Sequence, residues 1–179
     1  MKERGNYATI RKRQNKGTII MDIKEIIKGI TIREVKTGDE ALINEFFDAM
    51  GGETRALFNR RDYNRKGVLK FCQKGDPTRH YYMAEFEGKM AGYVFFLDYN
   101  TSIPTMGLAI RDDLRGLHLG KELITYAQGR ARTDGKGGLM LTTHVANIRA
   151  QSLYETMGFV NMGLCKNGSE LFYLWRFID

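Results

Sequence analysis

The amino-acid sequence changes from strand to helix within the segment Thr105-Met-Gly-Leu-Ala-Ile-Arg-Asp-Asp-Leu-Arg-Gly-Leu-His-Leu-Gly-Lys121. Residues 105–110 form a short apolar run that is typical of a buried strand. A turn with Gly116 and Gly120 follows, and a helical period begins at Leu119. A strand that turns through glycines into a helix directs several backbone N–H groups at one point, where the helix dipole adds partial positive charge. The segment therefore predicts an anion site, of which phosphate is the usual occupant.

Two common phosphate-binding motifs do not match this turn. A Walker loop needs four residues between its glycines and then Lys-Ser or Lys-Thr, but only Leu117, His118 and Leu119 separate Gly116 from Gly120, and a glutamate follows the lysine. The Gly-x-Gly-x-x-Gly pattern of a dinucleotide site is missing as well.

The turn resembles instead the acetyl-CoA motif of the GNAT superfamily of N-acetyltransferases, Gln/Arg-x-x-Gly-x-Gly/Ala. Arg115 and Gly120 match its first and last positions, and His118 stands where the family usually has its middle glycine. A histidine there predicts ordinary helical backbone angles, with a side chain that either faces solvent or lies near a phosphate.

A second signature of the same family follows in the expected order. The segment Asn147-Ile-Arg-Ala-Gln-Ser-Leu-Tyr-Glu-Thr-Met-Gly-Phe159 closely resembles the family pattern Asn-x-x-Ala-x-x-Leu-Tyr-x-x-x-Gly-Phe. The resemblance covers roughly residues 30–177. It divides the chain into an N-terminal extension, residues 1–29, and an acetyltransferase domain, residues 30–179.

Length and composition are those of one globular domain. A chain of 179 residues with 42% apolar and 27% charged residues can bury about 70% of its unfolded surface. No apolar run reaches the length of a membrane span and no signal segment opens the chain, so we expect a cytoplasmic protein without a membrane partner. Cys72 and Cys165 lack metal-type spacing and are expected to be reduced thiols, and the sequence predicts no metal site.

The net charge of +7 is concentrated near the N-terminus. Residues 1–30 contain eight Lys/Arg and three Asp/Glu, a net of +5. A basic arm can attract nucleic acid, but few aromatic residues interleave this one and no nucleic-acid motif accompanies it. We interpret residues 1–17 as a loosely ordered, solvated tail, and we do not expect a nucleic-acid partner.

Periodicity and turn signals predict the remaining elements. From Thr18 to Gly29, isoleucines at helical spacing predict a short amphipathic helix that docks on the domain or on a second copy of the chain, as in a homodimer. The following elements are a strand at 30–35, a helix at 37–50 capped by Thr37-Gly-Asp-Glu40, helical stretches at 56–58 and 63–71, a hairpin of strands at 80–86 and 90–98, a strand at 105–110, a helix at 119–132, a strand at 139–145, a helix from 147 to 158, and strands near 160 and at 171–177.

This order is that of the GNAT fold. The resemblance implies an α/β protein of the α+β type, with a central mixed, mostly antiparallel sheet of six or seven strands. About four helices would flank the sheet, and the extra N-terminal helix would be added to them.

The resemblance also implies where acetyl-CoA binds. In the family, the strand before the pyrophosphate turn splays from the next parallel strand, and the pantetheine arm of CoA pairs with the exposed edge. Carried over, the backbone of Leu108, Ala109 and Ile110 binds pantetheine, and small side chains at Gly107 and Ala109 allow its close approach. The N–H groups of the turn bind pyrophosphate, and they belong to Arg115, Gly116, Leu117, His118, Leu119, Gly120 and Lys121. Asn147 caps its helix and contacts the CoA arm.

Direct acetyl transfer requires a neutral amine and an acid for the departing thiolate. Tyr154 occupies the family's general-acid position, although its spacing from Ala150 also fits simple core packing. Many relatives carry a glutamate base on the strand at 105–110, and this chain has none there. Glu85, Asp98, His144 and a chain of water molecules remain as alternative bases.

Two functions of different class follow. The first is an N-acetyltransferase that transfers acetyl from acetyl-CoA to a primary amine of a small molecule or protein, by direct attack in a ternary complex. The second is a non-catalytic acyl-CoA-binding regulatory module on the same fold. For the amine acceptor, the aromatic residues that could line a pocket are Phe46, Phe47, Tyr63, Tyr81 and Tyr82.

Overall fold

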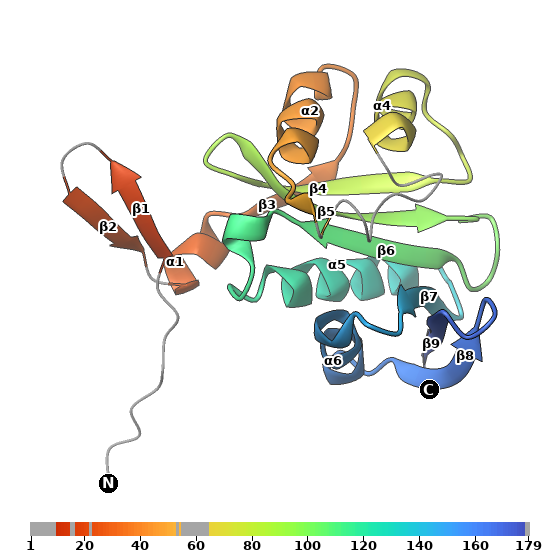
Figure 1. Cartoon of the computed structure of the whole chain (residues 1–179). Coiled ribbons are helices and arrows are strands. Elements are labelled where there is room, and N and C mark those ends of the chain that lie inside the picture. The colour runs from red at the N-terminus through yellow and green to blue at the C-terminus, as the bar shows by residue number, and fades with distance from the viewer. Residues whose placement is uncertain (1–9, 15–16, 22, 53, 55–64, 178–179) are drawn as a thin grey trace, which may run out of the picture.

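A seven-stranded mixed sheet forms the centre of the molecule (Figure 1). The structure is a computed structural model that describes residues 10–14, 17–21, 23–52, 54 and 65–177. The strand order is β3-β4-β5-β6-β7-β9-β8. Only β6 and β7 pair in parallel; the other neighbours are antiparallel. The strands are β3 (Thr31–Glu34), β4 (His80–Phe86), β5 (Lys89–Leu97), β6 (Thr105–Ile110), β7 (Gly138–His144), β8 (Val160–Cys165) and β9 (Glu170–Arg176).

Helices cover both faces of this sheet (Figure 1). The helices α2 (Glu40–Asp48) and α4 (Arg65–Lys74) lie on one face, with the fully buried Ile43 and Val68 in the core below them. The helices α5 (Leu119–Thr133) and α6 (Ile148–Thr156) lie on the other face, where Leu123 and Ile124 are fully buried. The expected α/β fold with a seven-stranded sheet is confirmed.

The β4–β5 hairpin shows how closely the turn signals fix the register. Glu87 and Gly88 both have positive φ, of 50° and 71°. Two consecutive residues in this conformation make the type I′ turn whose twist matches that of the two strands. The predicted hairpin is therefore present, and it carries nine-residue β5 into the middle of the sheet.

The N-terminal segment differs from the sequence expectation. Residues 10–14 form strand β1 (Ile10–Gln14), which pairs with β2 (Gly17–Met21) in a separate two-stranded ribbon beside the main sheet (Figure 1). The helix α1 is confined to Ile23–Lys28. The expected helix from Thr18 is thus wrong over its first turn, since the β-branched run Thr18-Ile19-Ile20 favours a strand.

The last turn of α1 joins the core of the main domain. Ile26 is 2% exposed and packs with the cluster on the α5 side of the sheet, and Ile27 and Ile30 lie against the same cluster. The helix was expected to dock on the domain or on a second copy of the chain. Ile26 contacts the domain itself. The helical stretch expected at 56–58 lies outside the described residues, and the one expected at 63–71 corresponds to α4. In the described part of the chain, no helix combines the length and apolarity that a membrane span needs.

The start of α2 is held by an ion-pair network rather than by the expected side-chain cap. Asp39 is the N-cap residue but makes no side-chain cap bond. Its carboxylate accepts hydrogen bonds from both terminal nitrogens of Arg33, at 2.8 Å each, and from the Lys36 N–H at 2.9 Å. Arg33 also pairs with Glu85 at 3.0 Å. The Thr37 hydroxyl donates instead to the Cys72 carbonyl of α4.

Replacement of Asp39 by asparagine should lower the free energy of unfolding at pH 7 by about 2 kcal/mol, because Asp39 is 5% exposed and its loss leaves Arg33 partly unpaired. Hydrogen bonds from Arg33 hold the pKa of Asp39 below its ordinary value, against the opposing effect of burial. A lowered folded pKa stabilises the protein above the unfolded value of about 3.9 and loses that effect as the pH falls through the folded value. Urea titrations of both proteins should therefore differ at pH 7 and converge in acid. A constant difference across that range would contradict this assignment.

Candidate active site

The parallel strands β6 and β7 part from one another soon after they begin. Their one paired position is Thr105 with Met140, where the Met140 N–H donates to the Pro104 carbonyl at 3.1 Å. Beyond it, β6 continues to Ile110 and β7 to His144 without further pairing. The edge of β6 that faces β7 is therefore open over most of its length.

The direction of the backbone groups on that edge follows from two hydrogen bonds. The Pro104 carbonyl points to β7, whereas the Arg111 N–H donates to Ala91 of β5 at 2.9 Å. Because strand residues alternate, the N–H and C=O groups of Leu108 and Ile110 point into the gap. Ala109 directs its backbone to β5. Leu108 and Ile110 are thus the two predicted pantetheine partners whose polar groups face the opening.

The small side chains of β6 take part in packing on the sheet face. A Cβ on Gly107 would collide with the ring of Phe95, which lies directly opposite on β5. Ala109 is 3% exposed and belongs to the core under α2. Gly107 thus leaves room for Phe95, and the expectation that these two residues also admit pantetheine stays a prediction.

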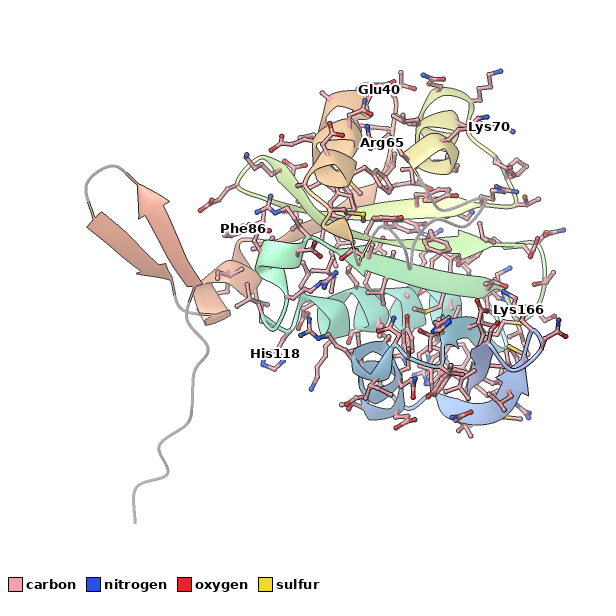
Figure 2. All side chains as sticks on the ribbon, viewed as in Figure 1. Glu40, Arg65, Lys70, Phe86, His118 and Lys166 are labelled. Atoms are coloured by element: carbon pink, nitrogen blue, oxygen red, sulfur yellow. The ribbon has the colours of Figure 1, made fainter. Side chains whose placement is uncertain are left out.

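The turn after β6 carries two left-handed residues before α5. A one-turn 3₁₀ helix, Asp112–Leu114, precedes them. Gly116 has φ +80° with open space around it, and His118 has φ 63° and ψ 2° at the N-cap of α5. The expectation of ordinary helical angles at His118 is wrong, since the turn requires left-handed backbone at the position where the family pattern has glycine. Its side chain is exposed and projects away from the start of α5 (Figure 2).

Gly120 brings α5 and α6 into contact. A Cβ at this position would lie 2.8 Å from a methyl group of Leu153 on α6 and 3.2 Å from Ile110. The absence of a side chain at Gly120 therefore lets the Leu153 and Ile110 side chains pack closely against α5. A larger residue at Gly120 would first displace the ends of these two side chains.

Asp112 anchors the turn to the segment after α2, a link that the sequence did not reveal. Its carboxylate accepts hydrogen bonds from the Gly51 N–H at 2.6 Å and the Thr54 hydroxyl at 2.7 Å, and it pairs with Arg115. Arg115 also donates to the Thr54 hydroxyl. Burial opposes ionisation of Asp112, but these hydrogen bonds and the charge of Arg115 outweigh it and lower its pKa. The Arg115 side chain thus positions the turn.

A cavity of about 540 Å³ runs from this turn along the open gap. Its wall includes all but one of the predicted cofactor-binding residues. The exception is Leu117, which is 4% exposed and packs in the core on the α5 side. The predicted residues that line it are Leu108, Ala109, Ile110, Arg115, Gly116, His118, Leu119, Gly120, Lys121 and Asn147.

The far wall of the cavity is formed by α6. The Asn147 side chain accepts the Ala150 N–H at 3.3 Å, which confirms the predicted cap, and the residue also lines the cavity. Tyr154 lines it too, is 7% exposed, and packs its ring 5.9 Å from the rings of Phe159 and Tyr173. Burial, with a smaller effect of Tyr173, raises the pKa of the Tyr154 hydroxyl above its ordinary value. This position fits core packing, and the role of Tyr154 as general acid stays a prediction.

Of the three candidate side-chain bases, His144 is the one that lies in the described cavity wall. His144 lines the cavity at the end of β7, and its Nδ1 accepts the Ala146 N–H at 3.1 Å, so the neutral ring carries its proton on Nε2. Glu85 of β4 pairs with Arg33 of β3, and Asp98 lies in the turn after β5. Neither Glu85 nor Asp98 belongs to the described wall of the cavity. Glu170, which the sequence analysis did not single out, lines the cavity and is 4% exposed.

A family model supplies the remaining observation. Residues 42–159 match the model described as the acetyltransferase (GNAT) family, which is more than half of the chain. The chain belongs to the GNAT acetyltransferase family. The two segments quoted from the sequence lie within the matched region or end with it at Phe159.

Individual members of the family resemble this GNAT protein over much of its length. A protein of Bacillus subtilis (strain 168), named as a candidate alanine N-acetyltransferase of ribosomal protein bS18, is 29% identical over 109 residues, 58% of this chain and 72% of its own. The GNAT domain of S. lividans PAT superposes with a TM-score of 0.71 at 14% identity, covering 96% of this chain and 97% of that one. Spermidine N-acetyltransferase from Vibrio cholerae, solved in complex with CoA and spermine, has a TM-score of 0.65 at 20% identity and covers 82% and 94%.

The aromatic residues expected to form an acceptor pocket in this GNAT protein pack mainly in the core instead. Phe46, Phe47 and Tyr81 belong to the buried cluster under α2 and α4, and Tyr82 belongs to the cluster on the α5 side. None of the four is part of the described wall of the gap, and Tyr63 lies outside the described residues. Within the described ranges, no three His, Cys, Asp or Glu side chains gather as metal ligands would.

The left-handed angles of His118 give a test of the turn. A non-glycine residue in this conformation costs about 1 kcal/mol. Glycine removes this cost, but its greater conformational freedom in the unfolded chain offsets part of the gain. His118→Gly should therefore raise the free energy of unfolding by roughly 0.5–1 kcal/mol.

The matched control is Thr125→Gly, an exposed position inside α5, where glycine should lower the stability by roughly 0.3 kcal/mol, the difference between the helix propensities of the two residues. Denaturant titrations of the three proteins measure both effects. Destabilisation by glycine at both positions would show that the turn does not need a left-handed residue at 118.

Proposed function

We propose that this protein is an acetyl-CoA-dependent N-acetyltransferase that acetylates a primary amine. The observation that carries the proposal is the open edge of β6, which leads at one end to a helix N-terminus and lies across the cavity from the buried hydroxyl-bearing ring of Tyr154. A phosphate-binding end and a proton donor in one cavity are what a thioester donor requires.

In this proposal the backbone supplies most of the contacts to acetyl-CoA. The N–H and C=O groups of Leu108 and Ile110 pair with the amides of the pantetheine arm as a further strand would. The pyrophosphate lies at the N-terminus of α5, where the first helical N–H groups have no partner four residues earlier. Lys121 and Arg149 line the same cavity and add positive charge. The fold of spermidine N-acetyltransferase from Vibrio cholerae, which was solved with CoA, supports the proposal that this protein binds acetyl-CoA.

Tyr154 serves the departing sulfur in this proposal. Its raised pKa keeps the hydroxyl protonated at neutral pH. A phenol with an ordinary pKa near 10 is already a weaker acid than a thiol near 8.5, so complete proton transfer to the thiolate is uphill by at least about 2 kcal/mol. The hydroxyl therefore acts first as a hydrogen-bond donor to the charge that develops on sulfur. A proton shed from nitrogen during amide formation makes the overall transfer favourable.

The alternative is a non-catalytic module that binds acyl-CoA. Both functions predict binding of acetyl-CoA, so turnover separates them. The test is the release of CoA thiol with spermidine, lysine and a peptide that begins with alanine, chosen because the relatives are named for a polyamine and for alanine. Calorimetric binding of acetyl-CoA without thiol release from any acceptor would favour the module and contradict the proposed enzyme.

Tyr154→Phe tests the role of the hydroxyl. The variant keeps the ring that packs on Phe159 and Tyr173, so the affinity for acetyl-CoA should be nearly unchanged. The turnover number should fall by at least about tenfold at neutral pH, because a positioned proton donor typically contributes about 10²–10⁴-fold.

Tyr173→Phe is the matched control. Its ring neighbours Tyr154, but its hydroxyl donates to Glu155 at 2.9 Å and the residue is not part of the described cavity wall. Removal of this hydroxyl should cost about 1 kcal/mol of stability and leave turnover intact. If both variants turn over at the wild-type rate, Tyr154 packs in the core and donates no proton.

A further inference from the structure

Glu170 is the carboxylate of the cavity. Among the residues that the structure describes, it is the one acidic side chain in the cavity wall, where the charged groups are otherwise Arg115, Lys121 and Arg149. It is 4% exposed, and its Oε2 lies 2.8 Å from Nζ of Lys166, which is itself half exposed. Lys166 lies on the β8–β9 hairpin (Figure 2). A buried carboxylate that is paired with a lysine at the wall of a cavity is a candidate partner for a cationic group.

The register of the sheet shows on which face of the sheet Glu170 lies. On β9, Glu170 lies opposite His144 of β7, and Tyr173 lies opposite Leu141. Directly opposite residues share a face, and residues three apart in a strand lie on opposite faces. Glu170 and His144 are therefore on one face, while Tyr173, with Tyr154 packed against it, is on the other. The carboxylate and the Tyr154 hydroxyl approach the cavity from opposite sides of the sheet.

The positively and negatively charged residues of the cavity wall come from different sides of the gap. Arg115 and Lys121 belong to the turn before and at the start of α5, where the CoA phosphates are proposed to lie. Glu170 and His144 belong to the last residue pair between β7 and β9. An anionic group would be repelled by Glu170, whereas an ammonium group would be attracted. The cavity thus has Arg115 and Lys121 on the side of β6 and α5, and its carboxylate on the side of β7 and β9.

We propose that Glu170 binds the ammonium group of the acceptor and removes its proton, an assignment that rests on the N-acetyltransferase function proposed above. One N–H proton passes to the carboxylate, and the freed nitrogen lone pair forms the C–N bond to the thioester carbonyl carbon. The C–S bond then breaks, and the thiolate receives the Tyr154 proton. The nitrogen's second proton restores the Tyr154 hydroxyl through water, and Glu170 releases its proton to solvent. The reaction yields the acetamide, CoA thiol and one proton.

Glu170→Gln keeps the size of the side chain and removes the base. With the best acceptor from the panel of spermidine, lysine and the alanine-led peptide, kcat should fall by at least about 100-fold at pH 7 while the affinity for acetyl-CoA is kept. The variant should recover activity as the pH rises toward the pKa of the acceptor amine, since a neutral amine needs no base. Glu87→Gln, the same change in the exposed β4–β5 turn outside the described cavity wall, should match the wild type.

The outcomes separate this inference from the function on which it rests. A Glu170→Gln protein that turns over as the wild type does would overturn the role of Glu170 and leave the acetyltransferase standing. Loss of acetyl-CoA binding in that variant would show a structural role and overturn it as well. A wild-type protein that binds acetyl-CoA and releases no thiol with any acceptor overturns both.

Lys166→Met gives a second measurement that does not depend on the folding of the Glu170 variant. The charged or titratable groups that face Glu170 are Lys166, His144 opposite on β7 and Cys165 opposite on β8, with Arg149 elsewhere in the wall. Without the Lys166 ammonium the carboxylate binds its proton more readily, so the acidic limb of the kcat/KM profile should move to higher pH. An unmoved acidic limb would overturn the assignment.

Discussion

The parting of β6 from β7 is the constraint on which the rest of this structure depends. Parallel neighbours normally satisfy each other's N–H and C=O groups, and here they do so at a single position, Thr105 with Met140. The separation is maintained from both sides. Gly120 lets α5 pack closely on Leu153 of α6, and the Gln151 amide donates to the Val145 carbonyl at 2.7 Å, which holds the turn that leaves β7. The unpaired edge of β6 is thereby fixed in place beside a cavity.

The charged groups around that gap come from different helices and strands. The dipole of α5 and the cations of its first turn lie where β6 ends, and the turn is tied by Asp112 to Gly51 and Thr54. Tyr154 lies on the face of the sheet that α5 and α6 cover, and Glu170 lies on the opposite face of β9. In the proposed reaction, a donor with an anionic end and an acceptor with a cationic end would therefore reach the gap from different sides.

Local patterns predicted the main sheet, its hairpin and the helices α2, α5 and α6, because periodicity and turn residues act over short distances. The same locality explains the errors. The isoleucines from Ile19 to Ile30 fit a helical period, but pairing with β1 made a strand of the first of them. His118 was assigned helical angles because nothing in its neighbours showed that the turn is left-handed. Glu170 and Asp112 were missed because their roles come from partners far away in sequence: β7, Gly51 and Thr54.

The central claim is that the open edge of β6 binds the pantetheine arm of acetyl-CoA. Residue-resolved amide hydrogen exchange tests it directly, because the N–H groups of Leu108 and Ile110 face the gap while that of Ala109 already faces β5. Saturating acetyl-CoA should slow exchange at Leu108 and Ile110 by about tenfold or more, well beyond any change at Ala109. If acetyl-CoA binds by calorimetry and the three amides respond alike or not at all, the arm does not pair with β6 and the account is wrong.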